Sequence, residues 1–171
     1  HLVKEIDALD GIMAKATDLS CIQFRMLNSS RGAAVRGPRA QNDRELYKKA
    51  IKNHVKEQKN LFLIEGSVED LLISQNKVNG VILDNNQTIV ADSVVLTTGT
   101  FLRGLIRIGS QKQDAGRVGD KPSIRLADKL NELKFSIGRL KTGTPPRLLK
   151  KSINFNNLSE QTADKNKIPF S

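Results

Sequence analysis

The apolar run Val94-Val95-Leu96, followed at once by Thr97-Thr98-Gly99-Thr100, constrains the fold of this chain most. A nearly uninterrupted apolar run is typical of a strand that is covered on both faces. Gly99 at its carboxyl end would let the backbone approach a ligand, and open α/β sheets bind ligands beyond the carboxyl ends of their strands. We therefore expect a buried strand with a ligand crevice at its tip.

The segments before this run change from a helical to a strand-like period. Apolar residues recur at three- and four-residue spacing over 2–13 and 46–55, which predicts two helices, and Asn42 or Asp43 can cap the second. Shorter apolar runs at 61–64, 78–83 and 89–96 predict strands. Turn-forming residues at 84–87 join the last two runs, so we expect an antiparallel hairpin within an α/β chain.

Three further stretches contain residues that are typical of loops and of helix starts. Residues 25–44 carry five arginines together with glycine and proline, which indicates a loop. After a glycine-rich basic stretch at 104–119, Ser123 is a plausible N-cap of a helix, and a helix N-terminus attracts anions. Residues 138–147 form a compact basic loop, and beyond it the chain turns polar. We place a domain boundary near residue 148, between a part at 1–147 and the start of a second domain at 148–171.

The net charge of +10 is distributed unevenly and suggests a polyanionic partner. Residues 1–60 carry 12 basic and 7 acidic side chains, residues 61–100 carry 1 and 5, and residues 101–171 carry 15 and 6. Lysine and arginine gain affinity for nucleic acid by neutralising phosphates and releasing counterions. The alternative is that the basic residues only solvate the surface. The single cysteine, Cys21, excludes an intrachain disulfide, and no run approaches the ~18 apolar residues of a membrane span.

Four blocks of the sequence resemble the GidA (MnmG) family. They are HLVKEIDAL at 1–9, AVRGPRAQNDRELY at 34–47, VVLTTGTFLRGLIRIG at 94–109 and GRLKTGTPPR at 138–147. Their order and spacing match as well, the resemblance covers nearly all of the chain, and the last block is the most specific. It implies an internal fragment, with residues 1–147 as part of a two-dinucleotide-binding (Rossmann-like) FAD domain carrying an inserted antiparallel β-hairpin or meander. No G-x-G-x-x-G fingerprint occurs in the chain, so the first phosphate-binding turn is expected outside it.

The resemblance also implies a function. GidA-like proteins are FAD enzymes that work with a GTPase partner of the MnmE type and add a carboxymethylaminomethyl or aminomethyl group to carbon 5 of the wobble uridine of tRNA. NADH and methylenetetrahydrofolate are the implied co-substrates, and a homodimer is the implied assembly. The expected location is the bacterial cytoplasm, or the mitochondrial matrix in a eukaryote. We expect no membrane association, no metal, and no activity from the fragment alone.

The resemblance assigns Val68 and Ser123 to contacts with FAD, with Val68 at the end of a strand, and strand-end geometry adds Gly99. No catalytic residue can be assigned, because the family's catalytic cysteines match no position here and Cys21 corresponds to neither. Candidates for tRNA phosphate or cofactor contact are basic, with solvated surface or internal ion pairing as alternatives: Arg25, Arg31, Arg36, Arg39, Arg139 and Lys141.

Two other functions stay open at this point. One is a fragment of a small-molecule flavin or NAD(P)H oxidoreductase, which would be recognised by paired cysteines. The other is a basic RNA-binding module without enzymatic activity, which would need aromatic side chains for base stacking. Aromatic residues make up only 4% of this chain, which disfavours the second alternative.

Overall fold

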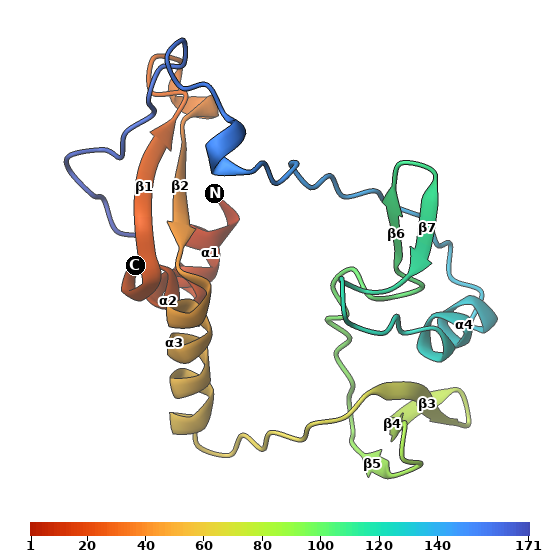
Figure 1. Cartoon of the computed structure of the whole chain (residues 1–171). Coiled ribbons are helices and arrows are strands. Elements are labelled where there is room, and N and C mark those ends of the chain that lie inside the picture. Colours follow the sequence, from red (N-terminus) through yellow and green to blue (C-terminus); the bar gives the residue numbers. More distant parts are fainter. The chain divides into compact units, whose positions relative to one another are not determined.

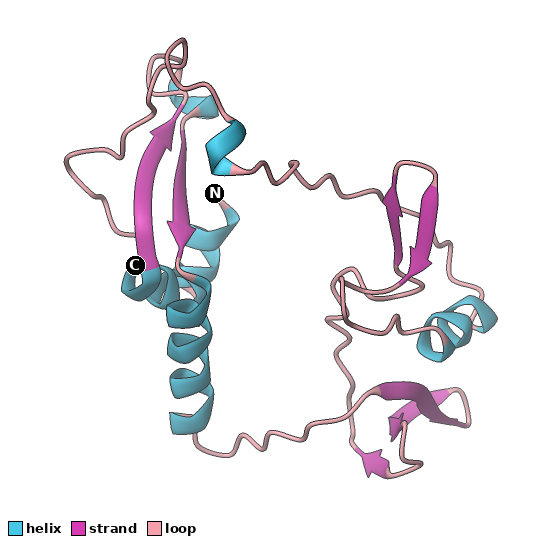
Figure 2. Ribbon diagram, viewed as in Figure 1, coloured by secondary structure: helices cyan, strands magenta, loops and turns pink.

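The computed structural model describes residues 1–171 and divides them into two compact units. Unit 1 comprises residues 1–62 and 146–171, and unit 2 comprises residues 63–145. Figure 1 labels the elements in chain order, and Figure 2 separates helices, strands and loops. No helix has both the length and the apolar character that crossing a membrane would require.

Unit 1 begins with two short helices, α1 (Leu2–Ala8) and α2 (Ile12–Ser20). The predicted single helix over 2–13 is therefore interrupted, because Asp10 adopts a positive φ of 65° and Gly11 becomes the N-cap of α2. Helix α3 (Arg44–Glu57) forms as predicted. Its N-cap is Asp43, whose carboxylate accepts the Leu46 N–H at 2.9 Å and so satisfies one of the free donors of the first turn.

Residues 25–44 do not form the expected loop. Strands β1 (Cys21–Leu27) and β2 (Gly37–Asn42) pair antiparallel, and the short 3₁₀ helix η1 (Ala33–Val35) lies between them. Pro38 is tolerated in β2 because Met26 and Pro38 face each other as a non-hydrogen-bonded pair: the Met26 N–H points away from β2, to the Asp164 carboxylate 2.6 Å away, and the N–H that proline lacks would point away from β1. Glycine and proline therefore did not break the strand here.

The carboxyl-terminal segment of unit 1 lies along β1, as Figure 1 shows in dark blue. It follows the 3₁₀ helix η2 (Lys150–Ser152). The Asp164 N–H donates to the Phe24 carbonyl at 2.9 Å, and the segment ends with Phe170 buried against Ala14 and Phe24. The core of this unit therefore joins its first and last residues in sequence.

Unit 2 contains two antiparallel sheets and one helix. Strands β3 (Val68–Ser74), β4 (Lys77–Leu83) and β5 (Thr88–Val90) form a meander, which confirms the predicted hairpin with its turn at 84–87. Strands β6 (Leu105–Ile108) and β7 (Gln111–Asp114) form a separate hairpin. Helix α4 (Arg125–Glu132) buries Leu126 and Ala127 and packs against β3.

Two predicted strands are wrong. Residues 61–64 and 94–96 are irregular, and the Val95 side chain is 84% exposed where a covered strand was expected. A strand inside a parallel sheet needs hydrogen-bonded neighbours on both edges, and no segment of residues 1–171 pairs with either run. The apolar character of these runs favoured a strand, but without a paired neighbour neither run forms one.

Candidate functional site

Val68 is the first residue of β3 rather than the last residue of a strand. It is half-buried and pairs with Leu83 on β4. The sequence placed Val68 at the end of a strand that flanks a ligand crevice. This prediction is wrong in detail, because β3 begins at Val68. Its neighbours Glu69 and Asp70 contact α4 through weak ion pairs to Arg125 at 3.9 Å and Lys129 at 3.6 Å.

Gly99 lies in a turn with a φ of 59°, a conformation that L residues other than asparagine and aspartate rarely adopt. A side chain added there would meet nothing within 4 Å, so the conformation of the backbone, and not crowding, calls for glycine. The turn is closed by the Phe101 N–H, which donates to the Thr98 carbonyl at 3.4 Å. Gly99 was expected at the carboxyl end of a buried strand, and that strand is absent.

Ser123 does not cap α4. The N-cap is Ile124, and no side chain caps the helix. The backbone of Ser123 is instead held against the preceding loop: its N–H donates to the Phe101 carbonyl at 2.9 Å, and its carbonyl accepts the Arg103 N–H at 3.0 Å. This short parallel bridge, which pairs Leu102 with Ser123, displaces the helix start by one residue.

The three nominated residues lie on segments that contact one another. Ser123 is joined to the loop that follows Gly99 through the Phe101 hydrogen bond, and β3 is joined to α4 through Glu69. They do not line the depression of about 220 Å³ in this unit, although residues on both sides of Ser123 do. Val68, Gly99 and Ser123 therefore do not line a shared groove.

This depression is basic. Its lining residues come from the glycine-rich loop, β7, the approach to α4 and the loop after it: Arg103, Gly104, Leu105, Asp114, Pro122, Ile124 and Arg139. The Arg103 guanidinium binds the Asp128 carboxylate on α4, and an Arg139 Nη donates to the Arg103 carbonyl at 2.8 Å. Sequence reasoning did not nominate Arg103, and its place in a glycine-rich basic loop was the only signal.

The size and charge of the depression set what it can hold. Sites for small molecules usually measure about 300–1,000 Å³, so a cavity of about 220 Å³ is too small for a whole dinucleotide. Arg139 forms no ion pair and keeps donors that suit a phosphate group, whereas the Arg103 guanidinium is already bound to the Asp128 carboxylate. The residues present therefore fit the phosphate end of a nucleotide cofactor, and only that part of it.

The six basic residues nominated for phosphate contact form no ion pair with a carboxylate. Arg25 instead donates to the Thr162 carbonyl at 2.7 Å, and Arg36 donates to the Arg31 carbonyl at 2.9 Å. Arg39 lies opposite Arg25 in the β1–β2 pair, and its buried Nε has no partner. Internal ion pairing, one of the two alternatives for these residues, is therefore wrong.

Other chemistry is sparse in the chain. Cys21 is half-buried and free, and no group of three or more histidine, cysteine, aspartate or glutamate side chains is placed to hold a metal ion. The sequence assigned no nucleophile, base and orienting group that together would identify a catalytic centre. Cys21, a free thiol, does not add such a centre.

The comparisons with known proteins agree over the full length of the chain. The family described as glucose inhibited division protein A matches residues 1–171. A protein of Granulibacter bethesdensis named tRNA uridine 5-carboxymethylaminomethyl modification enzyme MnmG is 55% identical over 174 aligned positions, which cover 100% of this chain and 28% of that protein. The chain thus spans little more than a quarter of its relative.

Solved structures of GidA and of a GidA-related protein share the fold of this chain. GidA of Aquifex aeolicus, in its form II crystal, superposes with a TM-score of 0.88 at 41% identity and covers 99% of this chain and 28% of that one. The GidA-related protein of Thermus thermophilus, at 18% identity and a TM-score of 0.51, covers 68% of this chain and 52% of that one, and shows a shared fold alone.

Fold and comparisons together define a mixed α/β protein with an inserted antiparallel meander, built on the fold of GidA, which confirms the predicted fold class. The chain belongs to the GidA family, since the family match extends over every residue. The resemblance seen in four sequence blocks is therefore confirmed.

Proposed function

We propose that this chain is part of an enzyme that modifies the wobble uridine of tRNA. One observation carries the proposal: 55% identity across the whole chain to a protein named for modification of a tRNA uridine. Because the chain spans only 28% of that relative, the activity belongs to the whole protein that carries this sequence. The group added is a carboxymethylaminomethyl or aminomethyl group at carbon 5, in line with the name of the relative.

The proposed cofactor is FAD, which supplies reducing power for the reaction when it is bound. Within this chain, Val68, Gly99 and Ser123 are proposed to contact it. The hydrogen-bonded junction of Phe101 with Ser123 supports the proposal, since it holds two of these segments together. Arg139, which forms no ion pair, would bind a phosphate group of the cofactor at the depression beside Ser123.

The proposed substrate is tRNA, and the arginines of unit 1 are its proposed phosphate contacts. The absence of carboxylate partners supports this role, because an unpaired guanidinium retains its donors for phosphate oxygens. A GTPase partner of the MnmE type, NADH, methylenetetrahydrofolate, a homodimer and a cytoplasmic location complete the proposal by analogy with the family.

The test uses the whole protein that carries this sequence. Purified protein is expected to be yellow with an FAD absorption spectrum. Expression in a bacterium that lacks its own GidA should restore the modified wobble uridine, measured by mass spectrometry of nucleosides from its tRNA. A folded, colourless protein that leaves the uridine unmodified would contradict both the cofactor and the substrate. Yellow protein without restored modification would favour a small-molecule flavin oxidoreductase.

A further inference from the structure

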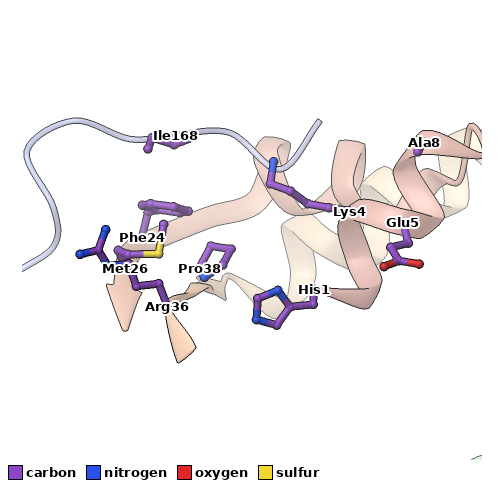
Figure 3. A pocket seen from close by; sticks show the side chains of 9 residues that line it. All are labelled: His1, Lys4, Glu5, Ala8, Phe24, Met26, Arg36, Pro38 and Ile168. Carbon is purple, nitrogen blue, oxygen red and sulfur yellow. The ribbon is translucent and has the colours of Figure 1, made fainter. Parts of the chain in front are cut away.

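Two hollows of the molecule differ in the backbone conformation of the residues that line them. Figure 3 shows the larger one, a cavity of about 480 Å³ in unit 1 that is lined in part by His1, Lys4 and Ile168. None of its lining residues has a positive φ. The depression of about 220 Å³ in unit 2 is lined in part by Arg103, which has a φ of 43°. Residues other than glycine, asparagine and aspartate rarely adopt this conformation, so the backbone of Arg103 is strained.

Three contacts hold Arg103 in this conformation. Its N–H donates to the Ser123 carbonyl at 3.0 Å, and its own carbonyl accepts an Nη of Arg139 at 2.8 Å. Its guanidinium binds Asp128 on α4, with the Nε 2.9 Å from a carboxylate oxygen. Backbone strain that is maintained by surrounding contacts occurs most often at functional sites, and here it lies at the depression proposed for phosphate.

The ion pair is the only one of these contacts that uses the Arg103 side chain. It ties the strained residue to α4, and the carbonyl of the same residue is the hydrogen-bond acceptor for Arg139. Arg139 forms no ion pair, so this carbonyl is what orients its guanidinium. The Asp128 carboxylate is therefore linked, through Arg103, to the arginine that is proposed to bind phosphate.

We propose that Asp128 is a positioning residue: by holding Arg103, it places the Arg103 carbonyl so that Arg139 is oriented for the phosphate. Asp128 does not line the depression and acts through the other two residues. A guanidinium that is oriented in advance loses less side-chain entropy on binding, so the ion pair raises the affinity for the ligand without touching it. The role of Asp128 rests on the proposed function in one respect, that Arg139 binds a phosphate group of FAD.

The first experiment reverses the ion pair in the whole protein that carries this sequence. Asp128→Arg places two guanidinium groups side by side and should raise the dissociation constant for FAD by about 5- to 10-fold, a modest loss because both side chains are about half-exposed. Adding Arg103→Asp restores opposite charges on the same two positions, and the dissociation constant should return to within about twofold of its original value. Fluorescence titration of the FAD-free protein measures both variants.

Hydrogen exchange without FAD tests the same variants independently of the cofactor. The Arg103 N–H should exchange faster in Asp128→Arg, because its bond to the Ser123 carbonyl opens more often, and should recover in the reversed pair. The matched control is Asp120→Arg, which disrupts the exposed pair with Arg117 in the same unit and should change neither measurement. Circular dichroism checks that each variant is folded.

Arg139→Gln tests the route by which Asp128 acts. This variant should weaken FAD binding by about 10- to 100-fold, since it removes hydrogen bonds to a charged group. Adding Asp128→Arg to it should cause no further loss, because two changes on one route are not additive. If Asp128 only stabilised the fold of unit 2, its loss would add in full to that of Arg139→Gln.

The outcomes separate the role of Asp128 from the proposed function. If the unmodified protein binds no FAD, the proposed cofactor is wrong, and exchange of the Arg103 N–H still decides whether Asp128 holds this residue. The positioning role is overturned if folded Asp128→Arg changes neither measurement, if the reversed pair does not recover, or if the loss adds to that of Arg139→Gln. Should Asp128→Arg not fold, Asp128→Asn replaces it, with an expected loss of about 2- to 5-fold.

Discussion

The Asp18 carboxylate accepts the backbone N–H of Phe170 with both oxygens, at 3.0 and 2.9 Å, although 152 positions separate the two residues. The same carboxylate accepts the Ser171 N–H at 2.9 Å. The N–H groups of the last two residues therefore depend on one acidic side chain of α2, whereas the carbonyls of Pro169 and Phe170 accept from the Lys4 ammonium.

Removing this carboxylate should release the carboxyl-terminal segment. Asp18→Ala leaves the Phe170 N–H without a partner beside a buried ring, which costs about 1–3 kcal/mol in the free energy of unfolding of unit 1. Hydrogen exchange at Phe170 and Ser171 should accelerate in the same variant. Asp120→Ala, which removes an exposed pair with Arg117, is the control and should cost less than about 1 kcal/mol. Equal losses in the two variants would contradict the role given to Asp18.

The Phe170 ring itself should contribute more than its backbone contacts. It is 7% exposed, packs edge-on against Phe24 with ring centroids 6.0 Å apart, and lies under the Lys4 ammonium. Phe170→Ala is expected to lower the free energy of unfolding by about 3–5 kcal/mol, as for other buried phenylalanines. The matched control is Phe62→Ala, because that ring is 87% exposed. Denaturant unfolding measures the loss of stability in both variants. A small effect of Phe170→Ala would show that the carboxyl-terminal segment does not complete the core of unit 1.

Local patterns predicted the helices and the hairpin of β4 and β5, whereas strand β3, the hairpin of β6 and β7 and the pairing of β1 with β2 escaped prediction. The Asp43 cap and the turn at 84–87 depend on neighbouring residues only, and both are present. The hairpin of β1 and β2 was missed because Gly37 and Pro38 indicated a loop, whereas Pro38 occupies a non-hydrogen-bonded pair with Met26, a register that only the pairing of the two strands sets. The strands expected at 61–64 and 94–96 failed for the opposite reason, since their sequence suits a strand but nothing in the chain pairs with them.

The features of the candidate site that depend on contacts between distant residues also escaped prediction. Gly99 was expected at the tip of a strand, but it lies in a turn with a positive φ, because the strand has no partner in this chain. The N-cap assigned to Ser123 was wrong because its backbone is bound by Phe101 and Arg103, which no periodicity reveals. The basic depression beside it depends on contacts between Arg103, Asp128 and Arg139, which are brought together only by the fold.

One exposed ion pair predicts a small dependence on pH. The Lys15 ammonium hydrogen-bonds the Asp10 carboxylate at 2.5 Å, and this bond and its charge hold the pKa of Asp10 below its ordinary value of 3.8. Because the folded pKa is depressed, the pair stabilises the fold above pH 3.8, and its contribution is lost as the pH falls through the lower, folded pKa. Proton titration of Asp10 by NMR should give a pKa below 3.8, and Lys15→Gln should return it to that value. An unchanged Asp10 pKa in this variant would rule out Lys15 as the cause.

Gly80, the one glycine of the meander, should be hard to replace. It is buried in β4 with a φ of 151°, and a methyl group added there would overlap the backbone carbonyl of Ile89 on the paired strand β5. Neither strand can move away without breaking the ladder that joins them, so Gly80→Ala should destabilise unit 2 by about 1–3 kcal/mol from overpacking, and by more if the pairing is lost. Gly109→Ala is the informative comparison, because Gly109 has a positive φ of 60° but nothing within 4 Å of the added group. Gly109→Ala should lower the free energy of unfolding only through its strained backbone conformation, by about 1–2 kcal/mol. Thermal unfolding separates the two, and a Gly109→Ala variant as unstable as Gly80→Ala would mean that backbone conformation, and not contact with β5, sets the requirement for glycine at position 80.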